Sequence, residues 1–294
     1  MSLRVERVGA EPDLLGESPV WDARDGSLFW VDGVSRLVRC LDMVSGERRH
    51  WPAPSMVGSI GLTDDPERLV AALADGVYLF DLGRGALEPI FRPERADARV
   101  RFNDGKVARD GAFVCGSMGI HADPIGSFYR VDNSGAAQVF ASGIRISNAV
   151  CFSPDGRVLY FSDSLSGHIM AADYEAGRGP VGSPRLAVDT ARHGSGPDGA
   201  TVDTDGCLWV AMVQAGRIAR FRPDGELDRM IEAPTDIPSS VAFGGPDLRT
   251  LFVTSIKDSG SGRAISRHPE GGHLFAIEGL GVQGIPEPLF GRPV

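Results

Sequence analysis

Residues 148–163 read NAVCFSPDGRVLYFSD, and variants of this segment occur six times along the chain. In each copy a polar or small residue is followed four places later by an apolar one. Most copies then have an Asp-Gly turn, such as Asp155-Gly156, and a short run rich in β-branched and aromatic residues. Apolar runs of this length bounded by turn residues are typical of buried β-strands. The repeat therefore predicts an all-β fold made of similar units.

Two strands are predicted in every copy. The first is the apolar run after the turn, at residues 28–32, 69–73, 113–117, 159–163, 208–212 and 251–255. The second mostly ends at an acidic residue, and these strands lie at 36–42, 77–81, 127–132, 168–173, 217–221 and 273–278. Together they leave room in each copy for two further strands.

The spacing of the copies identifies the architecture. The equivalent residues Phe29, Val70, Val114, Tyr160, Trp209 and Phe252 are separated by 41, 44, 46, 49 and 43 positions. A period in the forties with paired strands is typical of β-propeller blades, which have four strands around a central channel. We therefore predict a single six-bladed β-propeller domain over 1–294, with residues 4–8 pairing with the last blade to close the ring.

Composition narrows the class of function. The net charge is −9, and no Lys/Arg-rich run is present, so we expect no nucleic-acid partner. No stretch is long and apolar enough for a bilayer, and residues 1–8 lack the apolar core of a signal peptide, so a cytoplasmic location is expected. The four cysteines form no C-x-x-C pair and are expected to be buried and reduced.

One position of the repeat is rich in oxygen ligands. It holds Glu17, Gly58, Asn103, Asn148, Asp198 and Ser239, a set called the ligand column below. A propeller brings equivalent positions together around its axis, and carboxylate and amide oxygens suit hard divalent cations. We therefore expect Glu17, Asn148 and Asp198 to hold a cation at the mouth of the channel. Taken singly, an Asn or Asp before a strand also caps turns.

Other candidate residues lie close to the ligand column in sequence. Arg101 precedes Asn103 by two positions and is expected to donate hydrogen bonds to a substrate or a developing anion, although a surface ion pair is an alternative. His121 and His193 stand in Gly-rich segments that lead toward the predicted mouth. No G-x-S-x-G elbow, H-E-x-x-H, phosphate loop or dinucleotide fingerprint occurs.

Six motifs together resemble the family of regucalcin (senescence marker protein), gluconolactonase and luciferin-regenerating enzyme. They are ESPVW at 17–21, RFNDGK at 101–106, ISN at 146–148, SDS at 162–164, PDG at 197–199 and GLGV at 279–282. The resemblance covers the chain from end to end. It implies a six-bladed propeller with one divalent metal held by Glu17, Asn148 and Asp198, and substrate contacts from Arg101 and Asn103.

The resemblance also implies a reaction, the hydrolysis of a sugar lactone to the hydroxy acid. In it the cation would act as Lewis acid and Asp198 as general base. Sugar-lactone-hydrolysing regucalcins carry an acidic side chain where this chain has Gly119-Ile120-His121. Ile120 and His121 are therefore expected to line a less polar pocket, which leaves a deoxy-sugar, pentose or non-sugar lactone open as substrate.

Three functional hypotheses remain at this point. The first is a metal-dependent lactonase acting on a small-molecule lactone, or on a related non-sugar lactone or ester. The second is a calcium-binding propeller without a catalytic role, because fold alone does not fix function. The third is a lyase or dehydratase that uses the same Lewis acid. The sequence leaves open the oligomeric state and whether the metal is calcium, magnesium, manganese, zinc or iron.

Overall fold

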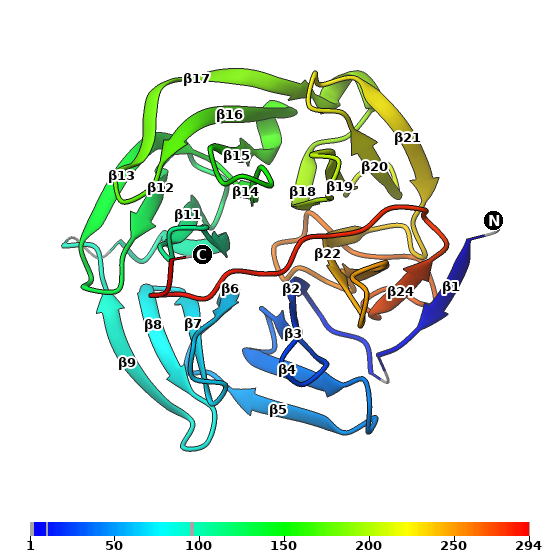
Figure 1. Cartoon of the computed structure of the whole chain (residues 1–294), viewed down its shortest axis with the longest axis horizontal. Helices are drawn as coiled ribbons and strands as arrows, with labels where there is room; N and C mark the ends of the chain where they lie inside the picture. Colours follow the sequence, from blue (N-terminus) through cyan, green and yellow to red (C-terminus); the bar gives the residue numbers. More distant parts are fainter. Residues whose placement is uncertain (1–2, 10, 95–96, 294) are drawn as a thin grey trace.

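A computed structural model describes residues 3–9, 11–94 and 97–293. Met1, Ser2, Ala10, Arg95, Ala96 and Val294 lie outside it. Within the described residues, 24 strands form six four-stranded antiparallel sheets, arranged as blades around a central channel (Figure 1). Two short 3₁₀ helices complete the secondary structure of these residues, η1 (Ser164–Ser166) and η2 (Thr190–His193).

The first three blades follow chain order from the innermost strand outward. The strands of blade 1 are β2 (Gly16–Asp22), β3 (Ser27–Asp32), β4 (Leu37–Asp42) and β5 (Arg48–Pro52). Those of blade 2 are β6 (Val57–Leu62), β7 (Arg68–Leu73), β8 (Gly76–Asp81) and β9 (Ala86–Phe91). Those of blade 3 are β10 (Val100–Val107), β11 (Phe113–Gly119), β12 (Gly126–Val131) and β13 (Ala137–Ile144).

The last three blades continue the series, and the sixth includes the first strand of the chain. The strands of blade 4 are β14 (Ser147–Phe152), β15 (Val158–Asp163), β16 (His168–Glu175) and β17 (Gly179–Asp189). Those of blade 5 are β18 (Pro197–Val202), β19 (Leu208–Met212), β20 (Arg217–Phe221) and β21 (Leu227–Glu232). Those of blade 6 are β22 (Pro238–Gly244), β23 (Thr250–Ser255), β24 (Phe275–Glu278) and β1 (Arg4–Arg7).

The predicted architecture is confirmed. All twelve predicted strands are present, and each boundary lies within two residues of the predicted one. The strand predicted at 36–42 begins at Leu37 because Arg36 has a positive φ of 60°, which places it in the turn before the strand. Ring closure is also as predicted, since β1 pairs antiparallel with β24 from Arg4 opposite Glu278 to Arg7 opposite Phe275.

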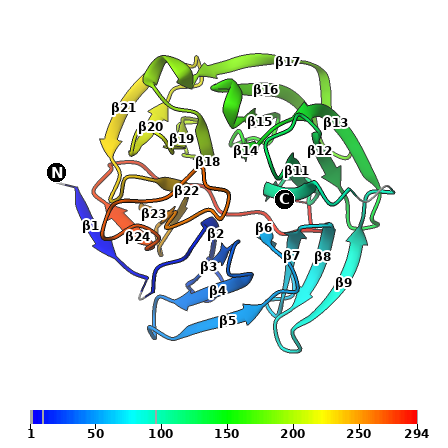
Figure 2. The ribbon, with the colours of Figure 1, turned by 180° about the vertical axis from the view of Figure 1, so that it is seen from behind.

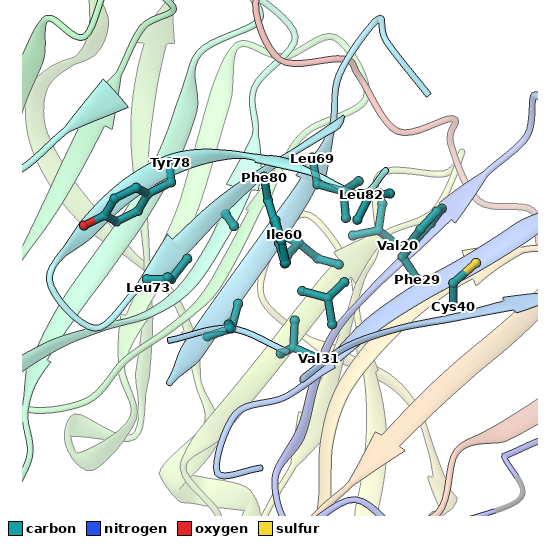
Figure 3. Close-up of a cluster of buried hydrophobic side chains, with 14 of the residues drawn as sticks. Val20, Phe29, Val31, Cys40, Ile60, Leu69, Leu73, Tyr78, Phe80 and Leu82 are labelled. Atoms are coloured by element: carbon teal, nitrogen blue, oxygen red, sulfur yellow. The ribbon is translucent and has the colours of Figure 1, made fainter. Parts of the chain in front are cut away.

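Apolar side chains between neighbouring blades hold the ring together. Figure 3 shows the cluster between blades 1 and 2, where Val20 and Phe29 face Ile60, Leu69 and other buried residues of the next sheet. Phe80 and Val31 in this cluster have no exposed surface. Burial of apolar surface stabilises by about 25 cal/mol per Å², so similar clusters around the ring supply most of the stability. All four cysteines are buried and free, as expected.

The two ends of the channel differ. Residues 279–293, the C-terminal strap, cross one face of the ring (Figure 1). Backbone N–H groups of Gly284, Phe290 and Gly291 donate to carbonyls of blade 6, blade 2 and blade 3 respectively. Seen from behind, the strap lies on the far side (Figure 2). We call the strapped side the closed end and the other side the open mouth.

The described part of the chain contains no helix with the length and hydropathy of a membrane span.

Candidate functional site

The ligand column lies on the six innermost strands, one residue per blade. Its members occupy equivalent positions near the start of β2, β6, β10, β14, β18 and β22. These starts lie at the same end of each blade as the connections from second to third strand. The ligand column is therefore at the open mouth, on the side opposite the strap.

Every innermost strand breaks its pairing register at the ligand column. The shifts lie between residues 17 and 20, 57 and 59, 102 and 105, 148 and 151, 197 and 200, and 238 and 240. A β-bulge bends the strand and redirects side chains next to it. Ser18 and Ala149, which follow Glu17 and Asn148, have positive φ angles of 49° and 57°. Such strain in non-glycine residues clusters at functional sites.

Acidic groups converge at the open mouth. Burial is the first cause that raises the pKa of Glu17 and of Asp198 well above the ordinary carboxyl value. Repulsion from Asp104 raises both further, and Asp198 also repels Glu17. Burial raises the pKa of Asp104 itself to about 6. The charge of Asp104 in blade 3 thus acts on Glu17 of blade 1 and on Asp198 of blade 5.

Arg101 is the cation of this group. Burial lowers the pKa of its guanidinium to about 10, while attraction to Glu17 and Asp198 opposes the shift. The side chain stays protonated at neutral pH. One guanidinium faces the carboxyls of Glu17 and Asp198, and Asp104 repels both, so these two groups are short of positive charge, which is the electrostatic condition for binding a cation.

The donor set fits a hard cation only if an amide is included. Among residues 3–9, 11–94 and 97–293, no three His, Cys, Asp or Glu side chains are grouped in a way that could hold a metal ion. Two carboxylates and the amide oxygen of Asn148 are the mixed oxygen set that calcium, magnesium and manganese accept. Asn148 and Asp198 are only 4% and 6% exposed, so few competing waters surround them.

Hydrogen bonds connect the ligand column from blade 3 to blade 5. Arg101 Nη1 donates to Asn103 Oδ1 at 2.6 Å, and Asn103 Nδ2 donates to Asn148 Oδ1 at 3.0 Å. Asn148 Nδ2 then donates to Ser164 Oγ at 2.8 Å, and Ser164 Oγ donates to the Pro197 carbonyl at 2.6 Å. Pro197 immediately precedes Asp198. The chain of bonds therefore joins Arg101, Asn103, Asn148 and the strand that carries Asp198.

The other two members of the ligand column have packing roles. A Cβ at Gly58 would lie 2.5 Å from the Asn103 carbonyl oxygen, so the residue permits close approach of β6 to β10. Ser239 Oγ donates to the Gly16 carbonyl and lies 3.0 Å from Thr254 Oγ1. Gly58 and Ser239 thus fix the strands next to Asn103 and Glu17.

Ile120 and His121 lie at the rim rather than in the buried cluster. They belong to the connection between β11 and β12, and both are exposed, with Ile120 at 37%. The Arg263 guanidinium donates to the His121 carbonyl from the connection between β23 and β24. Blades 3 and 6 stand opposite each other, so this bond spans the open mouth (Figure 2).

His193 is half-buried, and its ring centroid lies 5.5 Å from that of Phe221. This aromatic contact packs the His193 ring against blade 5.

Three residues of the site region received no role from sequence reasoning: Asp104, Ser164 and Lys106. Asp104 and Lys106 lie in the motif RFNDGK, and Ser164 lies in the motif SDS. These motifs mark the region of the site but not the role of each residue. Lys106 Nζ pairs with Glu287 Oε1 of the strap at 3.0 Å. A cavity of about 20 Å³ lies between Asp104 and Glu287 and is lined by inner-strand residues. That volume holds about one water, so a substrate has to enter through the open mouth.

Known proteins resemble this chain in sequence and in fold. The chain is 36% identical to 6-deoxy-6-sulfogluconolactonase of Pseudomonas putida, with 99% of each chain covered. It is 37% identical to L-arabinolactonase of Azospirillum brasilense, over 90% of this chain and 88% of that protein. The crystal structure of a calcium-binding protein, regucalcin, from Agrobacterium tumefaciens superposes with a TM-score of 0.91 at 31% identity, covering 98% of this chain and 97% of that one.

The family model described as SMP-30/Gluconolactonase/LRE-like region matches residues 15–257, which include the ligand column and all six innermost strands. The chain therefore belongs to the SMP-30/gluconolactonase/LRE-like family.

Proposed function

We propose that this protein is a metal-dependent lactonase that hydrolyses a small sugar lactone to its hydroxy acid. The observation that carries the proposal is the group of carboxyls at the open mouth, where burial and repulsion from Asp104 raise the pKa of Glu17 and Asp198 beside the Arg101 guanidinium. An oxygen-rich site at the open mouth suits a cation and a polar substrate together. Membership of a family that includes named lactonases supports the same reaction.

Glu17, Asn148 and Asp198 are the ligands in this proposal, each from a different blade. A bound divalent cation supplies Lewis acidity toward the lactone carbonyl. The charge of the site favours occupancy, because a cation removes the repulsion that raises the pKa of Glu17 and Asp198. The similar structure from Agrobacterium tumefaciens is that of a calcium-binding protein, which supports a divalent ion, and calcium, magnesium, manganese, zinc and iron are all candidates.

The residues of this chain have separate tasks in ring opening. Asp198 takes a proton from the attacking water while the oxygen of that water forms a bond to the lactone carbonyl carbon. Arg101 keeps donors free besides the Nη1 that bonds to Asn103, and these stabilise the negative charge that develops on the carbonyl oxygen. The ring C–O bond then breaks, and the ring oxygen accepts a proton to become the new hydroxyl group.

The rim residues bear on which lactone is bound. Ile120 contributes apolar surface, and His121 brings no permanent negative charge to accept hydrogen bonds from sugar hydroxyls. The contact between Arg263 and His121 narrows the entrance. We therefore propose a monomeric lactone with an aldonic, deoxy or pentose skeleton as the substrate class.

A titration assay tests the reaction directly. Purified protein is incubated with aldonolactones and with simple γ- and δ-lactones, and acid release is followed in a pH-stat. Each substrate is tested with chelator and after adding back each cation. Lactonase activity that chelator abolishes and a cation restores is the expected result. Cation binding without hydrolysis of any lactone or ester would instead support a calcium-binding role, and loss of water from the substrate would indicate a lyase.

A further inference from the structure

Ser164 occupies a rigid position beside the ligand column. Its backbone N–H donates to the Ile146 carbonyl at 2.9 Å. The preceding residue, Asp163, accepts bonds from the N–H groups of Arg145, Ile146 and Leu165 at 3.1 to 3.2 Å. The start of η1 is thus tied to the segment that leads into β14, which carries Asn148. The Ser164 hydroxyl is held in place by backbone bonds on both sides.

The partners of this hydroxyl determine the direction of each bond. The Pro197 carbonyl is an acceptor only, so Ser164 has to give its single proton to that oxygen, at 2.6 Å. The Ser164 oxygen can then only accept a hydrogen bond from Asn148, at 2.8 Å. The amide atom of Asn148 that faces Ser164 must therefore be the nitrogen.

A second chain of bonds gives the same answer from the other side. The amide nitrogen of Asn103 donates to the Ser147 carbonyl at 2.9 Å, and that oxygen is again an acceptor only. The same nitrogen lies 3.0 Å from Asn148, where it needs an acceptor. The atom of Asn148 on this side must therefore be the oxygen. Two backbone carbonyls, of Ser147 and Pro197, thus fix which end of the Asn148 amide is which.

We propose that Ser164 is a positioning residue that keeps the oxygen of Asn148, and not its nitrogen, available to the cation. This inference rests on the proposed function in one respect, that Asn148 is a ligand. Asn148 is only 4% exposed, so without the hydroxyl its NH₂ group loses a partner in a place where water does not readily replace it. Ser164 also holds the carbonyl next to Asp198, so it acts on two ligands from two blades.

Three variants test this role, with cation affinity measured by calorimetry on protein freed of metal by chelator. Ser164→Ala is expected to weaken the affinity for Ca²⁺ or Mn²⁺ by about 10- to 100-fold, the usual cost of losing an outer-shell partner. Ser164→Thr keeps the hydroxyl and is expected to stay within about threefold of wild type. At saturating cation, kcat of Ser164→Ala is expected to recover, because the defect is in holding the ion.

Ser162→Ala is the matched control. Ser162 is buried on β15 of the same blade, opposite Asn148 in the strand pairing, and its hydroxyl donates to the His168 carbonyl at 2.6 Å and not to the Asn148 amide. It loses a comparable hydrogen bond, so it reports on general destabilisation of the blade. Wild-type affinity in Ser164→Ala, or equal losses in both Ala variants, would overturn the proposal.

A readout without metal separates this inference from the proposed function. The side-chain NH₂ of Asn148 is assigned in a ¹H–¹⁵N spectrum by its absence in Asn148→Asp. In cation-free wild-type protein these protons are expected to exchange slowly with solvent, and in Ser164→Ala at least tenfold faster. Unchanged exchange contradicts the positioning role. Failure of the wild-type protein to bind any cation would instead refute the proposed function and leave the exchange result to decide the role of Ser164.

Discussion

The open mouth and the closed end of the channel are built from the same six innermost strands, yet they differ in almost every physical respect. At the mouth each strand is bulged, two non-glycine residues have positive φ, and the charge of Asp104 raises the pKa of Glu17 and Asp198 further above the value set by burial. At the closed end the strands pair regularly, the strap caps them, and Lys106 and Glu287 neutralise each other. The groups that can bind a cation therefore lie where strand pairing is irregular. The strap and the Lys106–Glu287 ion pair lie where strand pairing is regular.

This contrast leads to a first prediction about activity. Asp198→Asn is expected to lower kcat by 10³-fold or more, because it removes the proposed base and one charge of the cation site. The measurement is lactone hydrolysis in a pH-stat at saturating cation. The matched control at the other end is Glu287→Gln, which is expected to keep kcat within about twofold. More than a tenth of wild-type activity in Asp198→Asn would place the base elsewhere.

The second prediction concerns pH and the cation-free protein. Burial raises the pKa of Asp104 from 3.8 to about 6, so the native state holds this proton more tightly than the unfolded state. Stability therefore falls as pH rises from about 4 to 7, by roughly 3 kcal/mol from this group alone at 1.36 kcal/mol per pKa unit. Glu17 and Asp198 contribute with the same sign. Urea unfolding at several pH values measures the fall.

Asp104→Asn provides the comparison for that experiment. The variant lacks the titrating group, so its stability is expected to decline less over the same pH range. Equal slopes for both proteins would show that Asp104 does not carry the effect.

The third prediction is that adding cation stabilises the mouth. A ligand present at 100 times its Kd stabilises the native state by about 2.7 kcal/mol. For a chain of this size that corresponds to a rise in Tm of roughly 5 to 10 °C. The rise is expected to be larger at pH 7 than at pH 5, since fewer carboxyls are protonated at the higher pH. Differential scanning calorimetry with and without chelator tests it, and an unchanged Tm would argue against an occupied site.

The fourth prediction addresses the closed end. Glu287→Gln leaves Lys106 without its ion pair in a channel where the two side chains are only 16% and 10% exposed. We expect a loss of about 2 kcal/mol in urea unfolding, less than for a fully buried pair because water reaches part of this one. Cation affinity is expected to stay the same. A change in affinity would mean that the two ends of the channel are coupled.

The smallest effect is expected at the rim. His121→Glu adds a carboxylate that accepts hydrogen bonds from sugar hydroxyls, each contributing about 1 kcal/mol. KM for a hydroxyl-rich aldonolactone is expected to fall about three- to tenfold, with little change for an unsubstituted γ-lactone. His121→Gln serves as the neutral control. Equal KM changes for both lactones would show that His121 does not face the sugar hydroxyls.

The repeat explains why so much of the fold was predictable from sequence. Equivalent positions in a propeller have equivalent environments. Alignment of the six copies therefore predicts one strand position for Glu17, Asn148 and Asp198, and all three lie on innermost strands. The pairing of residues 4–8 with the last blade was predicted from their place before the first innermost strand, and β1 pairs with β24 there.

The features missed from sequence are those that break the repeat. Regular strand alternation places Asn103 and Asp104 on opposite faces of the sheet. The register shift between Phe102 and Gly105 includes both residues, and Asp104 acts on Glu17 and Asp198. The strap has no counterpart in the other copies, so its place across the channel had no periodic signal. Ser164 was overlooked because its role depends on a carbonyl from the next blade.

The pairing of β1 with β24 has a consequence for how the protein is made. Arg4 and Glu278 are neighbours in one sheet, so β1 has no partner until β24 has left the ribosome. Contacts of such long sequence separation slow folding and leave an unpaired strand edge exposed in the meantime. During synthesis the first four-residue strand has to wait, unattached, for a partner translated more than 260 residues later.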